Sequence, residues 1–299
     1  MKILVTGASG LVGSALVPFL TAREHQVTRL VRKPPGSGAQ ELSWDPDAGR
    51  LDATSLEAFD AVVHLAGESI AQRWTDTKMR RILDSRVTGT RMLACALAAL
   101  ERPPQVMVSA SAVGYYGNRG DEVLVEESSP GSGFLADVCC QWEQAAGPVT
   151  GGGTRLVVIR IGMILSAAGG ALRRMLPPFR FGIGGKLGSG NQYVSWIALD
   201  DLLEIILFTL ANPALRGAVN AVAPNPVTNL EFTQALGQVL RRATLVSVPA
   251  FAIQLMFGEM GEQVLLASAR VKPARLTAAA FAFRYPELEP ALRRALGKD

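Results

Sequence analysis

The sequence is poor in cysteine and has no long apolar run. Its three cysteines, Cys95, Cys139 and Cys140, have neither the spacing of metal ligands nor that of a disulfide framework. Neighbouring residues of a helix point in different directions, so we predict that Cys139 and Cys140 are reduced packing residues. Residues 202–210 are apolar but are interrupted by Glu204, and a bilayer span needs about 20 apolar residues. We therefore predict a buried helix at 202–210, no metal site and no membrane-spanning helix.

Charge also lacks a strong bias. Thirty Lys and Arg residues against 26 Asp and Glu give a formal net charge of +4, and no basic stripe indicates nucleic-acid binding. A strand predicted to begin within two residues of the N-terminus leaves no room for a signal peptide. The 299 residues, 48% hydrophobic and 19% charged, suffice for one large or two modest globular domains. We predict a cytoplasmic protein that binds neither nucleic acid nor membrane.

The first twenty residues carry the strongest functional signal. Residues 3–5 form a short apolar run typical of a buried parallel strand, and residues 11–20 have helical spacing of apolar side chains. Between them a G-x-x-G-x-x-G turn lets the backbone approach a pyrophosphate at the start of the helix. This context predicts a dinucleotide site rather than a merely structural turn, with contacts from Gly7, Ser9, Gly10, Leu11, Val12 and Gly13.

The end of the second predicted strand, residues 26–31, indicates which dinucleotide. An NAD-selective site places an Asp or Glu there to bind the ribose 2′-hydroxyl. This sequence instead has Arg32 and Lys33 after Val31, and a guanidinium suits a 2′-phosphate better than a neutral diol. The alternative is a solvated basic turn. We predict NADP(H), bound by Val31, Arg32 and Lys33.

Strands and helices alternate along the rest of the chain. Strands are predicted at 60–67, 105–109 and 154–161, and helices at 76–100 and 134–146. The predicted fold is therefore α/β, a doubly wound parallel (Rossmann) sheet with a smaller C-terminal region. We predict an NADP-binding domain at 1–225, with a loop insertion at about 166–200 over the site, and a mainly helical domain at 226–299. Further cofactor contacts are expected near strand ends, at Leu65, Ala66, Gly67, Ser109 and Ile164.

Motifs spread over the whole chain carry a family resemblance. They include Leu65-Ala66-Gly67-Glu68, Arg73-Trp74, Ser85-Arg86, Gly169-Gly170-Ala171, Pro177-Pro178-Phe179, Trp196-Ile197, Asp200-Asp201 and Gly258-Glu259-Met260. The chain resembles an extended short-chain dehydrogenase/reductase of the NAD(P)-dependent epimerase/dehydratase superfamily. More narrowly, it is similar to the YfcH-like "epimerase family protein" subfamily, which has its own C-terminal region. The resemblance implies a cofactor site more firmly than any one reaction.

The resemblance also exposes a departure in the catalytic residues. Family members use a Ser or Thr after the fifth strand and a Tyr-x-x-x-Lys pair on the next helix, where the lysine lowers the tyrosine pKa. Ser111 stands in the serine position. Aligning Glu143 with the family glutamate puts Leu135 at the tyrosine position and Cys139 at the lysine position, and the sequence has no lysine between Lys78 and Lys186. The dyad is absent.

Three residues are candidates for proton transfer in its place. Ser111 is the first, and Tyr115 on the following loop is the second, whereas Tyr116 matches a packing tyrosine. Glu68 is either an acid/base or ribose ligand, or a carboxylate that caps a helix or pairs with Arg73. A histidine in an apolar strand, His64, is predicted to be structural.

An arginine replaces the asparagine that related extended enzymes carry before a Val-x-Gly-Thr stretch. This residue, Arg86, is expected to face the cofactor and to bind a phosphate, a ribose oxygen or an anionic substrate group. Arg81 lies about one turn earlier and is a second candidate. The alternative for both is a solvated surface cation. We include both among the candidate cofactor contacts.

Three functions remain open at this level. The first is an NADP(H)-dependent oxidoreductase or epimerase-like enzyme with an unusual proton donor, acting on an unknown small-molecule substrate. The second is a non-catalytic NADP(H)-binding sensor or regulatory protein. The third, an ordinary sugar-nucleotide epimerase, is disfavoured by the missing dyad. A homodimer is one open possibility for the assembly.

Overall fold

The computed structural model describes residues 1–32 and 40–298. Its strands are β1 (Lys2–Thr6), β2 (Gln26–Val31), β3 (Glu41–Asp45), β4 (Arg50–Leu51), β5 (Ala61–His64), β6 (Val106–Ala112), β7 (Val123–Leu124), β8 (Arg155–Ile161), β9 (Met163–Leu165), β10 (Gly185–Leu187), β11 (Tyr193–Val194), β12 (Trp196–Ala198), β13 (Gly217–Ala221), β14 (Val227–Thr228), β15 (Val246–Val248) and β16 (Arg270–Val271). Its α-helices are α1 (Leu11–Thr21), α2 (Asp76–Ala98), α3 (Phe134–Ala146), α4 (Gly170–Arg180), α5 (Leu199–Ala211), α6 (Asn229–Leu240), α7 (Ala250–Phe257), α8 (Ala274–Ala278) and α9 (Leu288–Ala295). Lys33, a predicted phosphate ligand, lies outside the described residues.

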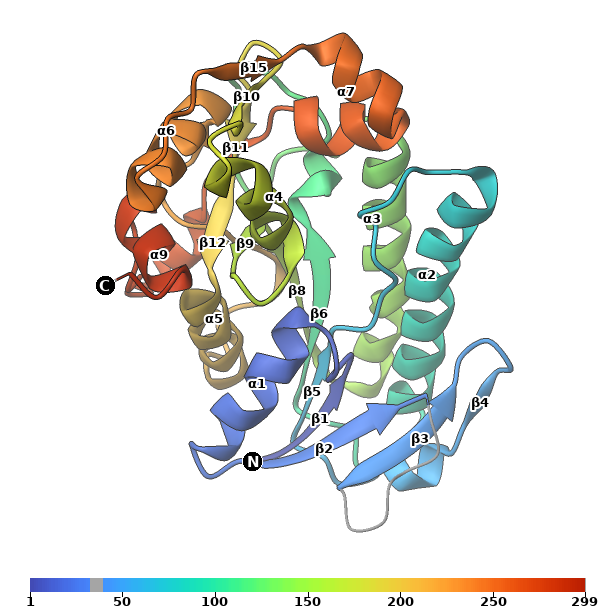
Figure 1. Cartoon of the computed structure of the whole chain (residues 1–299). Helices are drawn as coiled ribbons and strands as arrows, with labels where there is room; N and C mark the ends of the chain where they lie inside the picture. Colours follow the sequence, from blue (N-terminus) through green and yellow to red (C-terminus); the bar gives the residue numbers. More distant parts are fainter. Residues whose placement is uncertain (33–39, 299) are drawn as a thin grey trace.

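A single large sheet organises the molecule. Within the described residues it has eight strands in the order β13-β8-β6-β5-β1-β2-β3-β4, all parallel to their neighbours except β4, which is antiparallel to β3. Helices α1 and α5 cover one face, and α2 and α3 cover the other (Figure 1). The predicted α/β doubly wound parallel sheet with a smaller C-terminal region is confirmed.

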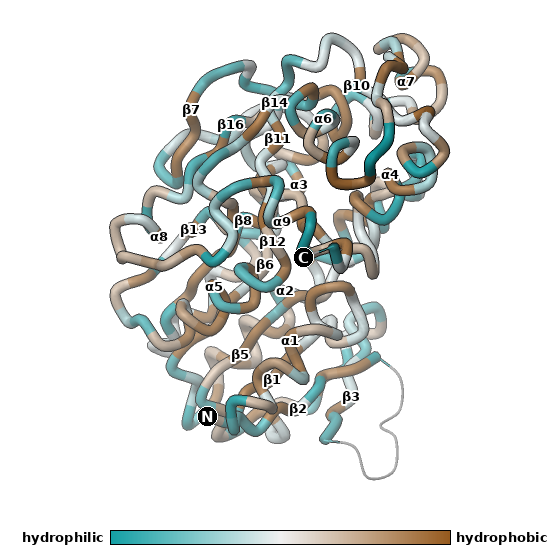
Figure 2. Tube along the Cα trace, turned by 60° about the vertical axis from the view of Figure 1, so that its left-hand side comes forward, coloured by the Kyte–Doolittle hydropathy of each residue, from teal (hydrophilic) through white to brown (hydrophobic). Residues whose placement is uncertain are grey.

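Burial on both faces explains the apolar central strands. Ile3, Leu4 and Val5 of β1 are fully buried, as is the whole of β5, and Figure 2 shows both strands as hydrophobic. The predicted bounds of β2 and α3 agree with the structure. The strand predicted at 60–67 is shorter and ends at His64. It stops there because the next two backbone N–H groups donate to the Thr6 hydroxyl instead of a neighbouring strand.

The prediction of a loop insertion at 166–200 was wrong in part. The segment contains the helix α4, followed by the short strands β10, β11 and β12. Leu172, Leu176 and Phe179 recur at i, i+4 and i+7 and are all buried, which is the spacing of an amphipathic helix. The prolines at 177 and 178 lie in the last turn of α4, and each removes one backbone donor from the helix.

The upper part of the molecule in Figure 1 lies beyond the carboxyl ends of the central strands. There α4, β9 and β12 share one apolar core with α6 and α9, and residues such as Trp196 and Phe232 form its buried centre. The domain boundary at residue 225 stays a prediction. The helix predicted at 202–210 is confirmed as part of the buried α5. Within residues 1–32 and 40–298, no helix is both long enough and apolar enough to cross a membrane.

Candidate functional site

The carboxyl ends of the parallel strands bring most predicted site residues to one edge of the sheet. Gly7 follows β1, Arg32 follows β2, Leu65 follows β5, and Ser111 lies in the last residues of β6. In open α/β sheets ligands bind at this edge, because the loops there leave room and the following helices begin there. The fold therefore supports a site at this edge.

The glycine turn between β1 and α1 accepts no larger residue at two of its three glycines. Gly7 has φ +66°, and a Cβ there would lie 2.6 Å from the backbone oxygen of Leu65. A Cβ at Gly13 would lie 2.2 Å from the oxygen of Gly7, so α1 packs directly against the turn. At Gly10 a Cβ would meet only the Gly7 oxygen, at 3.2 Å. The backbone at Gly10 is thus open to a close-approaching ligand.

The N-terminus of α1 suits an anion. No side chain caps it at Gly10, and its first turn contains no acidic residue. The first backbone N–H groups of a helix have no partner within it and carry partial positive charge. Ser9 and Gly10 are exposed, and Leu11 and Val12 are half-buried. These residues fit the pyrophosphate of a dinucleotide.

The end of β2 also fits a phosphate. Val31 is half-buried, and Arg32 is exposed without a carboxylate partner among the residues that the structure describes. An exposed guanidinium with no carboxylate partner can bind a 2′-phosphate with two parallel hydrogen bonds. The contacts of Val31 and Arg32 with a cofactor stay predictions.

The loop after β5 lies next to the glycine turn. The backbone N–H groups of Leu65 and Ala66 both donate to the Thr6 hydroxyl, over 3.1 and 3.2 Å, which fixes this loop against β1. On the other side, the Leu11 side chain lies 3.2 Å from the Cβ positions of two glycines at the start of α4. This contact holds the segment after Ile164 over the turn. Cofactor contacts from Leu65, Ala66 and Ile164 remain predictions.

Two of the predicted cofactor residues, Gly67 and Ser109, differ in their exposure to solvent. Gly67 is exposed at the end of the β5 loop. Ser109 is only 1% exposed inside β6. Gly67 is thus directly accessible to a cofactor, and the contact of Ser109 stays a prediction.

Glu68 forms a local ion pair. Its Oε1 lies 2.5 Å from Lys78 Nζ and 3.0 Å from Arg81 Nη2, and both cations come from α2. The hydrogen bond from Lys78 lowers the pKa of Glu68 below its usual range, so this carboxylate stays ionised and is a poor proton donor. Arg73, the partner named in one alternative for Glu68, instead donates to the Leu255 carbonyl. This geometry favours the structural interpretation of Glu68.

Ser111 belongs to a polar cluster that crosses two strands and a helix. It is directly opposite Arg160 in the parallel pairing of β6 and β8, so both side chains share one face of the sheet. Glu143 of α3 bridges them. Its Oε1 accepts from Ser111 Oγ over 2.7 Å, and its two oxygens accept from Arg160 over 2.9 Å each. The Ser111 side chain is therefore held in one orientation, and Ser111 as a whole is 3% exposed.

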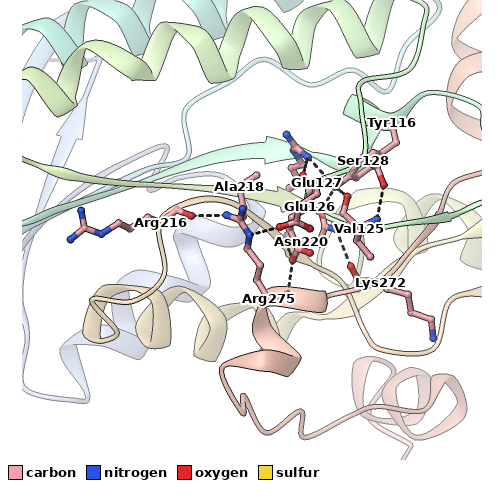
Figure 3. Close-up of polar contacts among 11 residues, drawn as sticks. Tyr116, Val125, Glu126, Glu127, Ser128, Arg216, Ala218, Asn220, Lys272 and Arg275 are labelled. Carbon is pink, nitrogen blue, oxygen red and sulfur yellow. Dashed lines mark hydrogen bonds and ion pairs between the residues drawn. The ribbon is translucent and has the colours of Figure 1, made fainter.

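Tyr116 extends this cluster into the C-terminal region. Its hydroxyl accepts from Arg160 over 3.0 Å and donates to Asn220 Oδ1 over 2.7 Å. Asn220 in turn donates to the Lys272 carbonyl, and Figure 3 shows the polar contacts around it. Tyr116 is fully buried, which raises its pKa and fits the packing role predicted for it.

Tyr115 stacks on the same arginine. Its ring centre lies 3.4 Å from the Arg160 Cζ atom, and the ring meets Tyr116 edge to face. Burial raises the pKa of Tyr115 above its ordinary value, although the charge of Arg160 opposes this. Tyr115 is accordingly protonated at neutral pH. Its role as a proton donor stays a prediction.

The two positions of the missing dyad hold groups that cannot replace it. Leu135 packs against Gly114, 3.4 Å from the Cβ position of that glycine. Burial raises the pKa of Cys139 to about 12, so its thiol is neutral. The described residues contain no cluster of His, Cys, Asp and Glu that could hold a metal ion, and their three cysteines are unbonded to each other.

His64 has the structural role predicted for it, and two tryptophans of the family motifs are also buried. The His64 ring lies 2.8 Å from both Thr6 Oγ1 and Thr90 Oγ1, and burial lowers its pKa to about 4. It is therefore neutral and hydrogen-bonded in the core. Trp74 and Trp196 are 9% and 0% exposed and belong to apolar clusters.

Sequence reasoning missed the Glu143–Arg160 pair. Glu143 served only to set the alignment of α3, and Arg160 was unremarked inside a predicted strand. A signal was available, since an arginine among the apolar residues of a central parallel strand must find a buried partner. The sequence did not indicate which carboxylate that partner is.

The sheet and its glycine turn define the Rossmann class of α/β proteins. A family model described as "NAD dependent epimerase/dehydratase family" matches residues 3–221, and a "Domain of unknown function (DUF1731)" model matches residues 248–295. The chain belongs to the NAD dependent epimerase/dehydratase family, among the epimerase family proteins with a C-terminal DUF1731 domain. The resemblance found in the sequence is confirmed.

Several relatives are similar over nearly their whole length. "Epimerase family protein Mb2239" of Mycobacterium bovis is 44% identical over 291 residues, which cover 97% of this chain and 96% of the relative. The human "Epimerase family protein SDR39U1" is 38% identical over 298 residues, with 98% and 99% coverage.

Two solved structures extend the comparison. The crystal structure of human SDR39U1 (isoform 2) with NADPH has a TM-score of 0.91 and 36% identity, and the match covers 100% of both chains. A Corynebacterium glutamicum structure described as a nucleoside-diphosphate sugar epimerase has a TM-score of 0.82 and 38% identity. That match covers 100% of this chain and 59% of the longer one.

Proposed function

We propose that this protein is an NADP(H)-dependent oxidoreductase or epimerase-like enzyme that acts on a small substrate with a hydroxyl or carbonyl group. The observation that carries the proposal is the Ser111–Glu143–Arg160 cluster at the carboxyl end of β6. A buried ion pair that fixes one serine hydroxyl at the ligand edge of a Rossmann sheet is suited to orient a reacting oxygen.

Three features support NADP(H) as the cofactor. The glycine turn leaves backbone space at Gly10, the uncapped end of α1 suits the pyrophosphate, and Arg32 suits the 2′-phosphate. The human relative was crystallised with NADPH. NADP(H), when bound, would supply or accept the hydride. We also propose that the protein is located in the cytoplasm. Whether it forms a homodimer is left open.

The hydrogen bond between Ser111 and Glu143 sets what Ser111 can offer a substrate. An ionised carboxylate only accepts hydrogen bonds, so the single proton of Ser111 is directed to Glu143. The Ser111 oxygen then retains lone pairs that can accept a hydrogen bond from a substrate hydroxyl. In this arrangement Ser111 contacts the substrate, and Glu143 and Arg160 are positioning residues.

A non-catalytic NADP(H) sensor is the second candidate, and the missing dyad favours it. Leu135 cannot transfer a proton, and the Cys139 thiol is neutral and buried. Such a protein would keep the cofactor site but would not need Ser111 to be reactive.

Ser111→Ala separates the two candidates. We expect the variant to bind NADPH as the wild type does, measured by quenching of NADPH fluorescence, and to lose at least ~100-fold in turnover of any substrate found by screening, because the substrate hydroxyl is no longer positioned. Thr90→Ser, a conservative change of another buried hydroxyl, is the control for folding. Full turnover by Ser111→Ala would remove Ser111 from the chemistry. Tight NADPH binding with no turnover of any alcohol or carbonyl compound would favour the sensor.

A further inference from the structure

Arg86 of α2 is a half-buried cation with unused hydrogen-bond donors. Its Nη1 donates to the Ile82 carbonyl over 3.1 Å, and its Cζ lies 4.9 Å from the centre of the Trp142 ring. A guanidinium has five N–H donors. Among the residues that the structure describes, no carboxylate forms a salt bridge with Arg86, so most of these donors have no protein partner.

The guanidinium lies beside the ligand edge of the sheet. A Cβ on Gly67, which is exposed at the end of the β5 loop, would lie 3.3 Å from the Arg86 Cζ atom. Trp142 stands three residues after Cys139 on the same face of α3. Arg86 is therefore close to Cys139, and its positive charge lowers the pKa of that thiol, against the larger effect of burial.

Ser111 reaches the same face of α3 from β6, because it donates to Glu143, which stands one turn after Cys139. Leu135, one turn before Cys139, is apolar. One small ligand can thus meet a hydroxyl oxygen at Ser111 and a fixed positive charge at Arg86. Burial lowers the pKa of Arg86 from its ordinary value, but an arginine keeps its charge at neutral pH.

The anionic groups of a dinucleotide already have partners elsewhere at this edge. The pyrophosphate fits the end of α1 at Gly10, and the 2′-phosphate fits Arg32. The nicotinamide ribose is neutral, and the oxidised nicotinamide ring is itself positive. Glu68, the nearest carboxylate along the β5 loop, is neutralised by Lys78 and Arg81. We therefore expect the anion that pairs with Arg86 to come from another ligand.

We propose that Arg86 binds the carboxylate of the substrate, and that this substrate is a short hydroxy acid or the matching oxo acid. The proposal rests on the proposed NADP(H)-dependent function and names its substrate class. The substrate hydroxyl donates to Ser111 Oγ, and the carboxylate accepts from the free donors of Arg86. Oxidation would transfer a hydride from the carbinol carbon to NADP⁺ and release the hydroxyl proton to water, giving the oxo acid and NADPH.

The test measures binding as well as turnover. Wild-type protein saturated with NADP⁺ is titrated with lactate and 3-hydroxybutanoate, and separately with lactamide and 3-hydroxybutanamide, by ligand-observed NMR. We expect the acids to bind at least ~10-fold more tightly than their amides, because a charge-assisted pair contributes about 1.5–3 kcal/mol. Arg86→Met should abolish this preference and leave the NADPH affinity within about threefold. Arg91→Met, an exposed arginine of the same helix, is the matched control.

Each other outcome overturns the inference in a recognisable way. Equal binding of acids and amides by the wild type means that no carboxylate is recognised, and this comparison needs no variant to fold. A tenfold or larger loss of NADPH affinity in Arg86→Met, with its thermal unfolding unchanged, would assign Arg86 to the cofactor instead. Failure of the wild type to bind NADPH at all would refute the proposed function itself.

Discussion

Replacing Arg160 by methionine should cost about 3–5 kcal/mol of unfolding free energy, the usual cost of breaking a buried ion pair by removing one partner. The Arg160 side chain is 5% exposed and donates four hydrogen bonds: two to Glu143, one to the Tyr116 hydroxyl and one to the Glu126 carbonyl. Methionine fills much of the same volume but leaves the Glu143 carboxylate, which is 16% exposed, without its cation.

Urea unfolding at pH 7, followed by circular dichroism, measures this loss. Arg293→Met is the matched control, because the Arg293–Glu289 pair is 45% and 46% exposed and such surface pairs contribute about 0–1 kcal/mol. A second variant, Arg160→Met with Glu143→Gln, should recover part of the loss, since it removes the stranded charge. The reasoning is refuted if Arg160→Met and Arg293→Met differ by less than about 1 kcal/mol.

Two further predictions concern the core histidine and the cofactor phosphate. His64 has a pKa of about 4 in the folded protein and about 6.5 when unfolded, so the unfolded chain binds the extra proton and stability falls as the pH drops. Between pH 7 and pH 5 this lowers the unfolding free energy by about 2 kcal/mol. In His64→Gln, urea unfolding should no longer show this part of the pH dependence. The same dependence of the unfolding free energy on pH in wild type and variant would contradict the prediction. Arg32→Asp should lower the ratio of NADPH to NADH affinity by about 10- to 100-fold in fluorescence titrations, and a constant ratio would exclude Arg32 from the 2′-phosphate site.

Local patterns gave much of the fold. The bounds of β2 and α3 follow from hydrophobic spacing within each segment, and the glycine turn follows from its G-x-x-G-x-x-G spacing between a strand and a helix. The structural role of His64 also followed from its apolar neighbours. Helix α4 was missed although its apolar residues recur at helical spacing, because the many glycines of this segment favoured a loop.

Charged side chains were harder to assign than strands and helices. One alternative left open for Glu68 was a pair with Arg73, and the structure instead pairs it with Lys78 and Arg81. The choice depends on how the β5 loop lies against α2, which no short-range pattern records.

The sequence by itself determined that the chain forms a Rossmann sheet with a glycine turn, and that its α3 helix lacks the tyrosine and lysine of the family. Only the tertiary structure decided that Ser111 is held by Glu143 and Arg160, and that Arg86 is left with free donors beside Gly67. The physical reason is the separation in sequence between the residues that interact. Backbone conformation depends on residues a few positions apart, whereas a charge interacts with whatever the folded chain brings within a few ångströms, however distant in sequence.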